Sequence, residues 1–289
     1  MSLNEERARV IENMRAALSE GDTFRKVELF DPIITDEDVR RVILPFDLLR
    51  KKPINKIKAY LARKLAEAFT KKVNGETELV GAENALNIKG GAFITANHYN
   101  PTDSTPIRML AYECGKRKLH DIVVQQSNIF MTGLFGFLMK NANTLPVSGL
   151  AEYTVNKLTP ALSELLAREH FILVYPEQEM WYNYKKPRGL RDGVYHWAAK
   201  FGVPIIPTFT EMRNLDGECG DDGFLPVKHI LHIMPPIYPD PSLSLRENRI
   251  AMWKKDDELK RAKYEEVYGI PLDNEFIPER DIAGYPTKM

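Results

Sequence analysis

The chain has 289 residues, 44% of them hydrophobic and 28% charged, and its 40 basic side chains balance 40 acidic ones. These values are typical of a globular protein with one large or two modest domains, and a net charge of zero predicts no nucleic-acid partner. Two cysteines without Cys-x-x-Cys spacing, Cys114 and Cys219, argue against a disulfide framework and against a structural zinc site.

The beginning of the chain is predicted to be helical. Apolar residues at helical spacing indicate a helix over residues 4–18, which Gly21 ends. A second helix is expected from Asp36, and it should kink or end near Leu44 because Pro45 follows. The sequence has no apolar run of ~18 residues and begins without an apolar signal core, so we expect neither a transmembrane helix nor secretion.

The third predicted helix, over residues 54–73, combines an apolar stripe with dense positive charge. Residues 50–72 hold nine basic side chains and one acidic side chain, so that nine minus one gives a net charge of +8. Such a helix can lie on an anionic membrane surface with its stripe among the lipid headgroups. The alternative is a solvated helix whose stripe packs on the domain behind it. The stripe comprises Ile54, Ile57, Leu61, Leu65, Ala68 and Phe69.

From about residue 76, short apolar runs alternate with helical segments. This alternation predicts an α/β fold with a largely parallel central sheet and helices on both faces, preceded by an N-terminal helical segment. The predicted strands are 77–80, 92–96, 122–125, 144–147, 171–175, 205–209 and 230–234. The predicted helices are 104–113, one within 128–139, 152–168, 193–201 and 243–268. We divide the chain into an N-terminal helical segment (1–75), an α/β domain (76–242), and a C-terminal helix and tail (243–289).

A polar stretch follows the strand predicted at 92–96, where the loops of parallel sheets carry catalytic residues. Residues 97–103 read Asn-His-Tyr-Asn-Pro-Thr-Asp, which is typical of a turn, and Asp103 is a good N-cap for the next helix. On a loop, the His98 imidazole and the Asp103 carboxylate can face each other. A carboxylate that accepts from one imidazole nitrogen leaves the other nitrogen available as a general base. The alternative for His98 is a loop histidine that is bonded to backbone.

Asn97-His98, followed after four residues by Asp103, resembles the first motif of the glycerolipid acyltransferases of the lysophosphatidic acid acyltransferase type. Two later stretches are similar to further motifs of that family, in the same order. Tyr-Pro-Glu at residues 175–177 resembles the family's Phe-Pro-Glu, and Val-Pro-Ile-Ile-Pro at residues 203–207 resembles a family strand. The resemblance covers roughly residues 77–240. It implies the fold and the acyl-transfer chemistry of that family.

The chain departs from the family at the two arginines that hold the acceptor phosphate. Ser148 stands near the place of one of them, after an apolar stretch at 126–139 that is suited to line an acyl chain, and Met180 stands at the place of the other. Because of these replacements, the sequence does not identify the acceptor. A basic loop follows, and it either forms a replacement anion site, since guanidinium groups bind phosphate, or is a solvated surface loop. Its basic residues are Lys185, Lys186, Arg188 and Arg191.

The resemblance implies an enzyme that moves a fatty acyl group from acyl-CoA or acyl-carrier protein to a hydroxyl of a lysophospholipid or related acceptor. His98 would deprotonate that hydroxyl and Asp103 would orient His98, with no metal ion and no resident cofactor. Asn97 and the four basic loop residues are candidate substrate-binding residues, and Glu177 would bond an acceptor hydroxyl, brace its loop or cap a helix. The alternatives are a lipid or acyl-thioester binding protein that has lost the chemistry, and a thioesterase. We expect a cytoplasmic protein, peripheral at the inner face of an anionic membrane.

Overall fold

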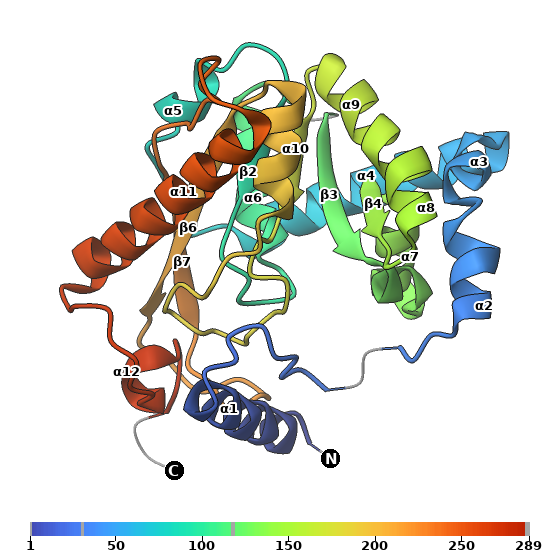
Figure 1. Cartoon of the computed structure of the whole chain (residues 1–289). Coiled ribbons are helices and arrows are strands. Elements are labelled where there is room, and N and C mark those ends of the chain that lie inside the picture. Colours follow the sequence, from blue (N-terminus) through green and yellow to red (C-terminus); the bar gives the residue numbers. More distant parts are fainter. Residues whose placement is uncertain (1, 30–31, 117–118, 287–289) are drawn as a thin grey trace.

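The computed structural model describes residues 2–29, 32–116 and 119–286. Seven strands of the described chain form one sheet in the order β1-β7-β6-β2-β5-β3-β4 (Figure 1). All neighbouring strands pair in parallel except β6 and β7, which pair antiparallel. The strands are β1 (Glu78–Val80), β2 (Ala92–Thr95), β3 (His120–Gln125), β4 (Thr144–Val147), β5 (Phe171–Val174), β6 (Ile205–Asn214) and β7 (Val227–Ile233). The predicted α/β fold with a largely parallel sheet is confirmed.

Helices cover both faces of the sheet. In Figure 1, α9 (Thr159–Ala167), α10 (Gly193–Phe201) and α11 (Leu245–Tyr268) lie in front of it, and α4 (Pro53–Val73) and α6 (Ser104–Glu113) lie behind it. Because both faces are covered, the central strands β2 and β5 are apolar runs in which every residue is buried, without the alternation of a half-exposed strand.

The remaining helical elements are short, apart from α1. They are α1 (Leu3–Ser19), α2 (Asp36–Asp38), η1 (Val39–Ile43), α3 (Phe46–Lys51), α5 (Glu83–Leu86), η2 (Gln126–Phe130), α7 (Gly133–Asn141), α8 (Ala151–Tyr153), η3 (Thr154–Leu158) and α12 (Pro278–Asp281). The helix that begins at Asp36 ends before Pro45, as predicted. The helix predicted at 152–168 is continuous through α8, η3 and α9, with a π-helical turn in its middle.

The strands β6 and β7 differ most from the prediction. β6 continues to Asn214, and β7 begins at Val227, so that both extend beyond the edge of the parallel sheet. Their antiparallel pairing runs from Thr208 opposite Ile233 to Asn214 opposite Val227, and each strand supplies the other's hydrogen bonds. The length of such a ribbon depends on its partner strand, which a local sequence pattern does not identify.

α1 and the C-terminal segment lie together beyond the carboxyl ends of the parallel strands (Figure 1). The buried face of α1, which includes Val10 and Met14, packs in one cluster with Trp181 and Tyr184 of the loop after β5 and with Ile282 near the C-terminus. The two ends of the chain therefore hold this loop between them. The proposed division at residues 75 and 242 stays a prediction, and this packing crosses both boundaries.

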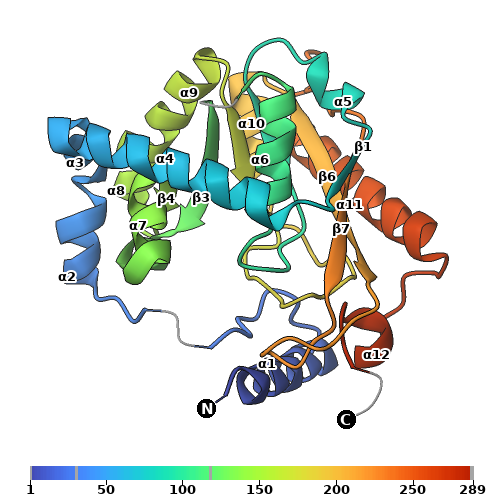
Figure 2. The ribbon, with the colours of Figure 1, turned by 180° about the vertical axis from the view of Figure 1, so that it is seen from behind.

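α4 crosses the back of the molecule at a steep angle to the strands (Figure 2) and contacts α6 and α7. Residues four apart share a helix face, and α4 packs through a row of small buried side chains, Ala62, Ala66 and Thr70. The apolar stripe is a different row. Ile57 is 58% exposed and Leu61 is 50% exposed. The stripe therefore does not pack on the domain, which rules out the alternative stated above. None of the helices in the described ranges is long and apolar enough to cross a membrane.

His120, at the start of β3, makes folding stability depend on pH. Its side chain is buried, and neither ring nitrogen has a hydrogen-bond partner in the part of the chain that the structure describes. Burial, and next the positive charges of Arg108 and His170, hold the pKa of His120 well below its usual value. The unfolded chain binds a proton below pH ~6.5 while the folded chain does not, so stability falls as the pH drops below that value.

We expect His120→Leu to flatten the pH dependence of the unfolding free energy below pH ~6.5, by up to about 1.4 kcal/mol per pH unit. Urea unfolding at a series of pH values from neutral to mildly acidic measures this slope. His196→Gln is the matched control, because His196 is only half buried, on α10. An unaltered slope in His120→Leu would contradict the prediction.

Candidate active site

Side chains at the start of the loop that follows β2 anchor it to α11 and to β6. Thr95, the last residue of β2, donates its hydroxyl to the buried carboxylate of Asp256 on α11 (2.7 Å). The Asn97 side chain then hydrogen-bonds to the backbone of β6. Its amide oxygen accepts from Thr210 N (2.8 Å) and its amide nitrogen donates to Thr210 O (3.2 Å). Asn97 is thus buried and fully engaged with the backbone, and its predicted contact with substrate stays a prediction.

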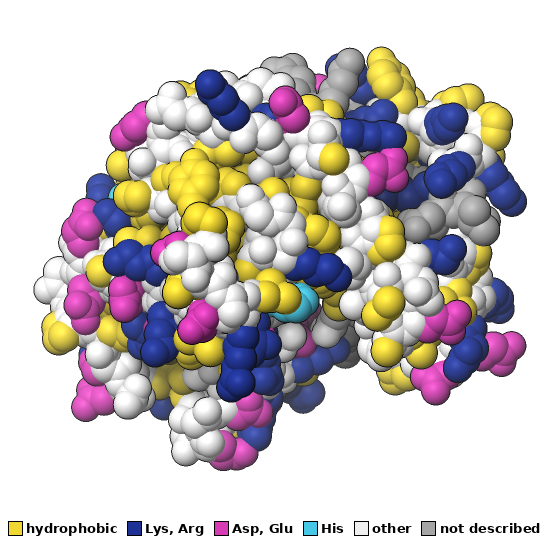
Figure 3. Space-filling view, turned by 45° about the horizontal axis from the view of Figure 1, so that its top comes forward, with side chains coloured by type: hydrophobic (Ala, Val, Ile, Leu, Met, Phe, Trp, Pro, Cys, Tyr) yellow, Lys and Arg dark blue, Asp and Glu magenta, His cyan; other side chains and the backbone are white. Residues whose placement is uncertain are grey.

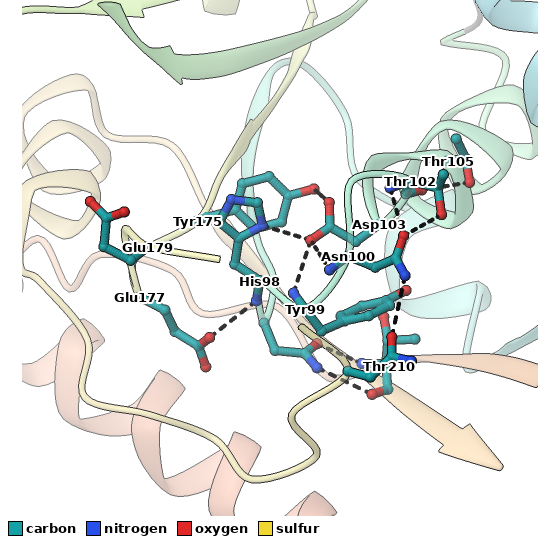
Figure 4. Close-up of polar contacts among 12 residues, drawn as sticks. His98, Tyr99, Asn100, Thr102, Asp103, Thr105, Tyr175, Glu177, Glu179 and Thr210 are labelled. Carbon is teal, nitrogen blue, oxygen red and sulfur yellow. Dashed lines mark hydrogen bonds and ion pairs between the residues drawn. The ribbon is translucent and has the colours of Figure 1, made fainter. Parts of the chain in front are cut away.

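The next residue, His98, lies against Asp103 in the geometry that its sequence spacing allowed. His98 Nδ1 and Asp103 Oδ2 are 2.6 Å apart (Figure 4). The Asp103 carboxylate is buried and also accepts from Tyr99 N (3.1 Å). A carboxylate in this position favours the tautomer in which Nδ1 carries the proton and Nε2 keeps its lone pair. The His98 side chain is 22% exposed, so an outside molecule can reach the ring.

Tyr175, directly after β5, completes the surroundings of this pair. Its hydroxyl donates to Asp103 Oδ1 (2.6 Å), and its ring stacks on the His98 imidazole with the centroids 4.1 Å apart. Burial, and next the Asp103 charge, raise the pKa of Tyr175 well above its usual value, so the phenol stays a proton donor. Sequence reasoning did not select Tyr175. The feature of the sequence that could have identified Tyr175 is the tyrosine itself. It stands where the family motif has phenylalanine, and it differs from phenylalanine by one hydroxyl.

Glu177 connects the loop after β5 to the loop after β2. Its Oε2 accepts from His98 N (3.1 Å), and Arg188 donates to the same oxygen through Nη2 (2.9 Å) and to Oε1 through its backbone N (3.1 Å). Both side chains of this ion pair are only 2% exposed. The backbone adds a further link, because Trp181 N donates to His98 O (3.0 Å). Of the roles predicted for Glu177, bracing the loop is the one for which the structure supplies contacts.

The four basic residues of the loop at 185–191 do not form one cluster. Lys185 Nζ donates to Arg280 O (3.0 Å), and Lys186 Nζ lies 2.6 Å from the Asp273 carboxylate, so that both fasten the C-terminal segment. Arg188 forms the buried ion pair with Glu177. Arg191 remains at the surface. All four have protein partners, which for Arg191 is the Gln178 side chain (3.3 Å), and their binding of substrate stays a prediction.

The model of the acyltransferase family matches residues 76–211. The match covers 136 of the chain's 289 residues, and it supports an acyltransferase. The chain is similar in fold to the crystal structure of the 1-acyl-sn-glycerophosphate (LPA) acyltransferase PlsC from Thermotoga maritima, with a TM-score of 0.51 and 18% sequence identity. That similarity covers 92% of this chain and 100% of the Thermotoga chain. No curated protein sequence matches the chain.

The predicted resemblance to the glycerolipid acyltransferases is confirmed by the family match together with the shared fold. The matched residues begin just before β1 and end within β6, so they contain His98, Asp103 and Glu177. The N-terminal helices and the C-terminal segment lie outside the family match. These findings support an acyltransferase, and they leave the donor, the acceptor and the roles of individual residues to be proposed.

Proposed function

We propose that this acyltransferase moves a fatty acyl group from a thioester donor, acyl-CoA or acyl-carrier protein, to a hydroxyl of a lysophospholipid or related acceptor. The observation that carries the proposal is the 2.6 Å contact between His98 Nδ1 and Asp103 at the carboxyl edge of the sheet. An imidazole held in this way, partly exposed and with its second nitrogen unprotonated, is equipped to take a proton from an alcohol.

The reaction follows from that geometry. His98 Nε2 takes the proton of the acceptor hydroxyl as the oxygen attacks the thioester carbonyl, and Asp103 stabilises the imidazolium that forms. The tetrahedral intermediate then collapses, the carbon–sulfur bond breaks, and the imidazolium returns its proton to the leaving thiolate. The products are an ester and a free thiol. No acyl-enzyme is needed, because both substrates can be bound together.

Acceptor-dependent release of thiol tests the proposal. The protein is mixed with palmitoyl-CoA, alone and with lysophosphatidic acid or another lysophospholipid, and free thiol and new ester are measured together. Thiol release that requires the acceptor and matches ester formation supports acyl transfer. Release without an acceptor would identify a thioesterase, and acyl-CoA binding with no release would identify a binding protein, so either result would overturn the proposal.

We also propose that α4 holds the protein on an anionic membrane surface, which is where acceptors of this class reside. The stripe of α4 is exposed along its length, from Ile54 (56%) to Phe69 (42%). The same segment carries the net charge of +8 that residues 50–72 supply. Exposed apolar side chains flanked by lysines match the two layers of a bilayer interface, in which acyl chains lie beneath anionic headgroups.

We expect the double substitution Leu61→Glu/Leu65→Glu to weaken binding to anionic vesicles by about 10-fold or more, because both leucines lose their apolar contact with lipid. Co-sedimentation with vesicles of phosphatidylglycerol and phosphatidylcholine measures the partition, and neutral vesicles give the baseline. Leu86→Glu is the matched control, since Leu86 is 52% exposed on α5, away from α4. Equal partition of the double variant and the unmodified protein would refute the role of α4.

A further inference from the structure

A cavity of about 370 Å³ opens on the face of the molecule that carries α10 and α11. Figure 3 shows this face, where Lys and Arg side chains stand beside apolar ones. The volume lies within the range of about 300–1,000 Å³ that small-molecule sites occupy. Three segments that are distant in the sequence line the cavity: Phe24 after α1, residues 190–192 before α10, and Arg249, Ile250 and Trp253 on α11.

The cavity and His98 lie on two sides of the same short loop. Arg191, which lines the cavity, donates its backbone N to Pro176 O (2.8 Å) and its Nε to the Gln178 side chain (3.3 Å). Between these two residues lies Glu177, whose carboxylate accepts from His98 N (3.1 Å). A residue that lines the cavity and His98 therefore contact the same three-residue segment, 176–178.

The charged groups of the cavity suit an anion. Arg191 and Arg249 carry two positive charges and Asp192 carries one negative charge, so the residues that line the cavity have a net charge of +1. The Arg191 guanidinium lies over the ring of Phe24, 3.8 Å from its centroid, which fixes its direction. Arg249 contacts Asp192 through Nη1 (3.3 Å). A guanidinium has five N–H donors, so Arg249 can bind phosphate as well as its carboxylate.

The N-terminus of α10 adds to this positive potential. Asp192 is the N-cap of α10, and its side chain makes no capping hydrogen bond in the described structure. The first-turn amides of α10 therefore have no side-chain acceptor, and such amides attract phosphate oxygens. The first turn is not crowded at Gly193, because a Cβ added there would meet no atom within 4 Å.

The apolar part of the cavity suits a flat ring. The Trp253 indole is fixed because its Nε1 donates to Leu190 O (2.9 Å), and Ile250 lies one turn before it on α11. An aromatic side chain held in this way offers a stacking surface for a base. Phosphate donors and a stacking surface in one cavity are the two features that a nucleotide requires.

We propose that this cavity binds the nucleotide end of coenzyme A, so that the acyl donor is acyl-CoA. The inference rests on the proposed function. The pantetheine arm, about as long as four extended residues or roughly 14 Å, would cross the loop at Glu177 and bring the thioester to His98. An acyl-carrier protein would instead present a broad acidic protein surface, which does not require a concave site with an aromatic wall.

The test compares palmitoyl-CoA with the palmitoyl-pantetheine thioester, which has the same reacting group and no nucleotide. We expect Arg191→Gln and Arg249→Gln each to lower the ratio of kcat/KM for palmitoyl-CoA over palmitoyl-pantetheine by about 10- to 100-fold, through KM. Arg246→Gln is the matched control, because Arg246 is an exposed arginine of α11 that does not line the cavity. An unchanged ratio in both variants, or a clear preference of the unmodified protein for acyl-carrier protein, would overturn the inference.

A second measurement separates this inference from the proposed function. Calorimetry with adenosine 3′,5′-bisphosphate detects the nucleotide site without any turnover, and we expect Arg191→Gln and Arg249→Gln to weaken that binding about 10-fold or more. Binding that depends on these arginines in a protein with no transferase activity would support the site and refute the proposed function. Turnover of palmitoyl-CoA with no nucleotide binding would support the function and refute the site.

Discussion

Replacing His98 by alanine is expected to lower acceptor-dependent thiol release by about 10²- to 10⁴-fold, the usual contribution of a general base. The imidazole is the only group removed. The acceptor hydroxyl then has to lose its proton to water, which is a weaker and less well placed base. The effect should fall on kcat, because the proton moves in the transition state and the variant keeps the rest of the site.

The controls separate chemistry from folding. The His98 side chain is partly exposed, so thermal unfolding of His98→Ala should match that of the unmodified protein closely. Asp103→Asn should also lower the rate, because an amide keeps the shape of the carboxylate and loses the charge that stabilises the imidazolium. Unchanged turnover in His98→Ala would remove the mechanism, whatever the other variants do.

Replacing Arg188 by methionine is expected to lower the free energy of unfolding by about 3–5 kcal/mol, the usual cost of breaking a buried ion pair from one side. Glu177 and Arg188 are each only 2% exposed, so the substitution leaves a carboxylate buried without its partner charge. Arg188 also donates to Thr23 O (2.9 Å), far back in the sequence, and that link is lost as well. Urea unfolding at neutral pH measures the loss.

Two further variants make this expectation specific. The double substitution Glu177→Gln/Arg188→Met removes both charges and should recover part of the loss, because no unpaired charge remains buried. Arg191→Met is the matched control three residues away, where the side chain is exposed and the change should stay within about 0.5 kcal/mol. A single variant Arg188→Met as stable as this control would show that the ion pair contributes little.

The sequence by itself predicted the order of elements and the edge of the sheet that carries the site. Apolar runs such as 171–175 and 144–147 have the length and the apolar character of buried strands. Both properties depend only on neighbouring residues, so they can be recognised without the tertiary structure. The contact between His98 and Asp103 could also be predicted from the sequence. Two side chains that attract each other and lie five residues apart on a turn have few possible arrangements. The hydroxyl of Tyr175 was visible in the sequence but had no partner until β5 lay beside β2.

The tertiary structure alone decided where the charges and the apolar stripe point. Lys186 and Arg188 belong to the same basic loop, yet one pairs with Asp273, 87 residues away, and the other with Glu177 and Thr23. The helix pattern of α4 identified its stripe but not which face packs, because the small side chains of Ala62 and Ala66 allow closer approach than the large ones. A local pattern specifies the type and spacing of side chains, whereas their partners come from segments that only folding brings together.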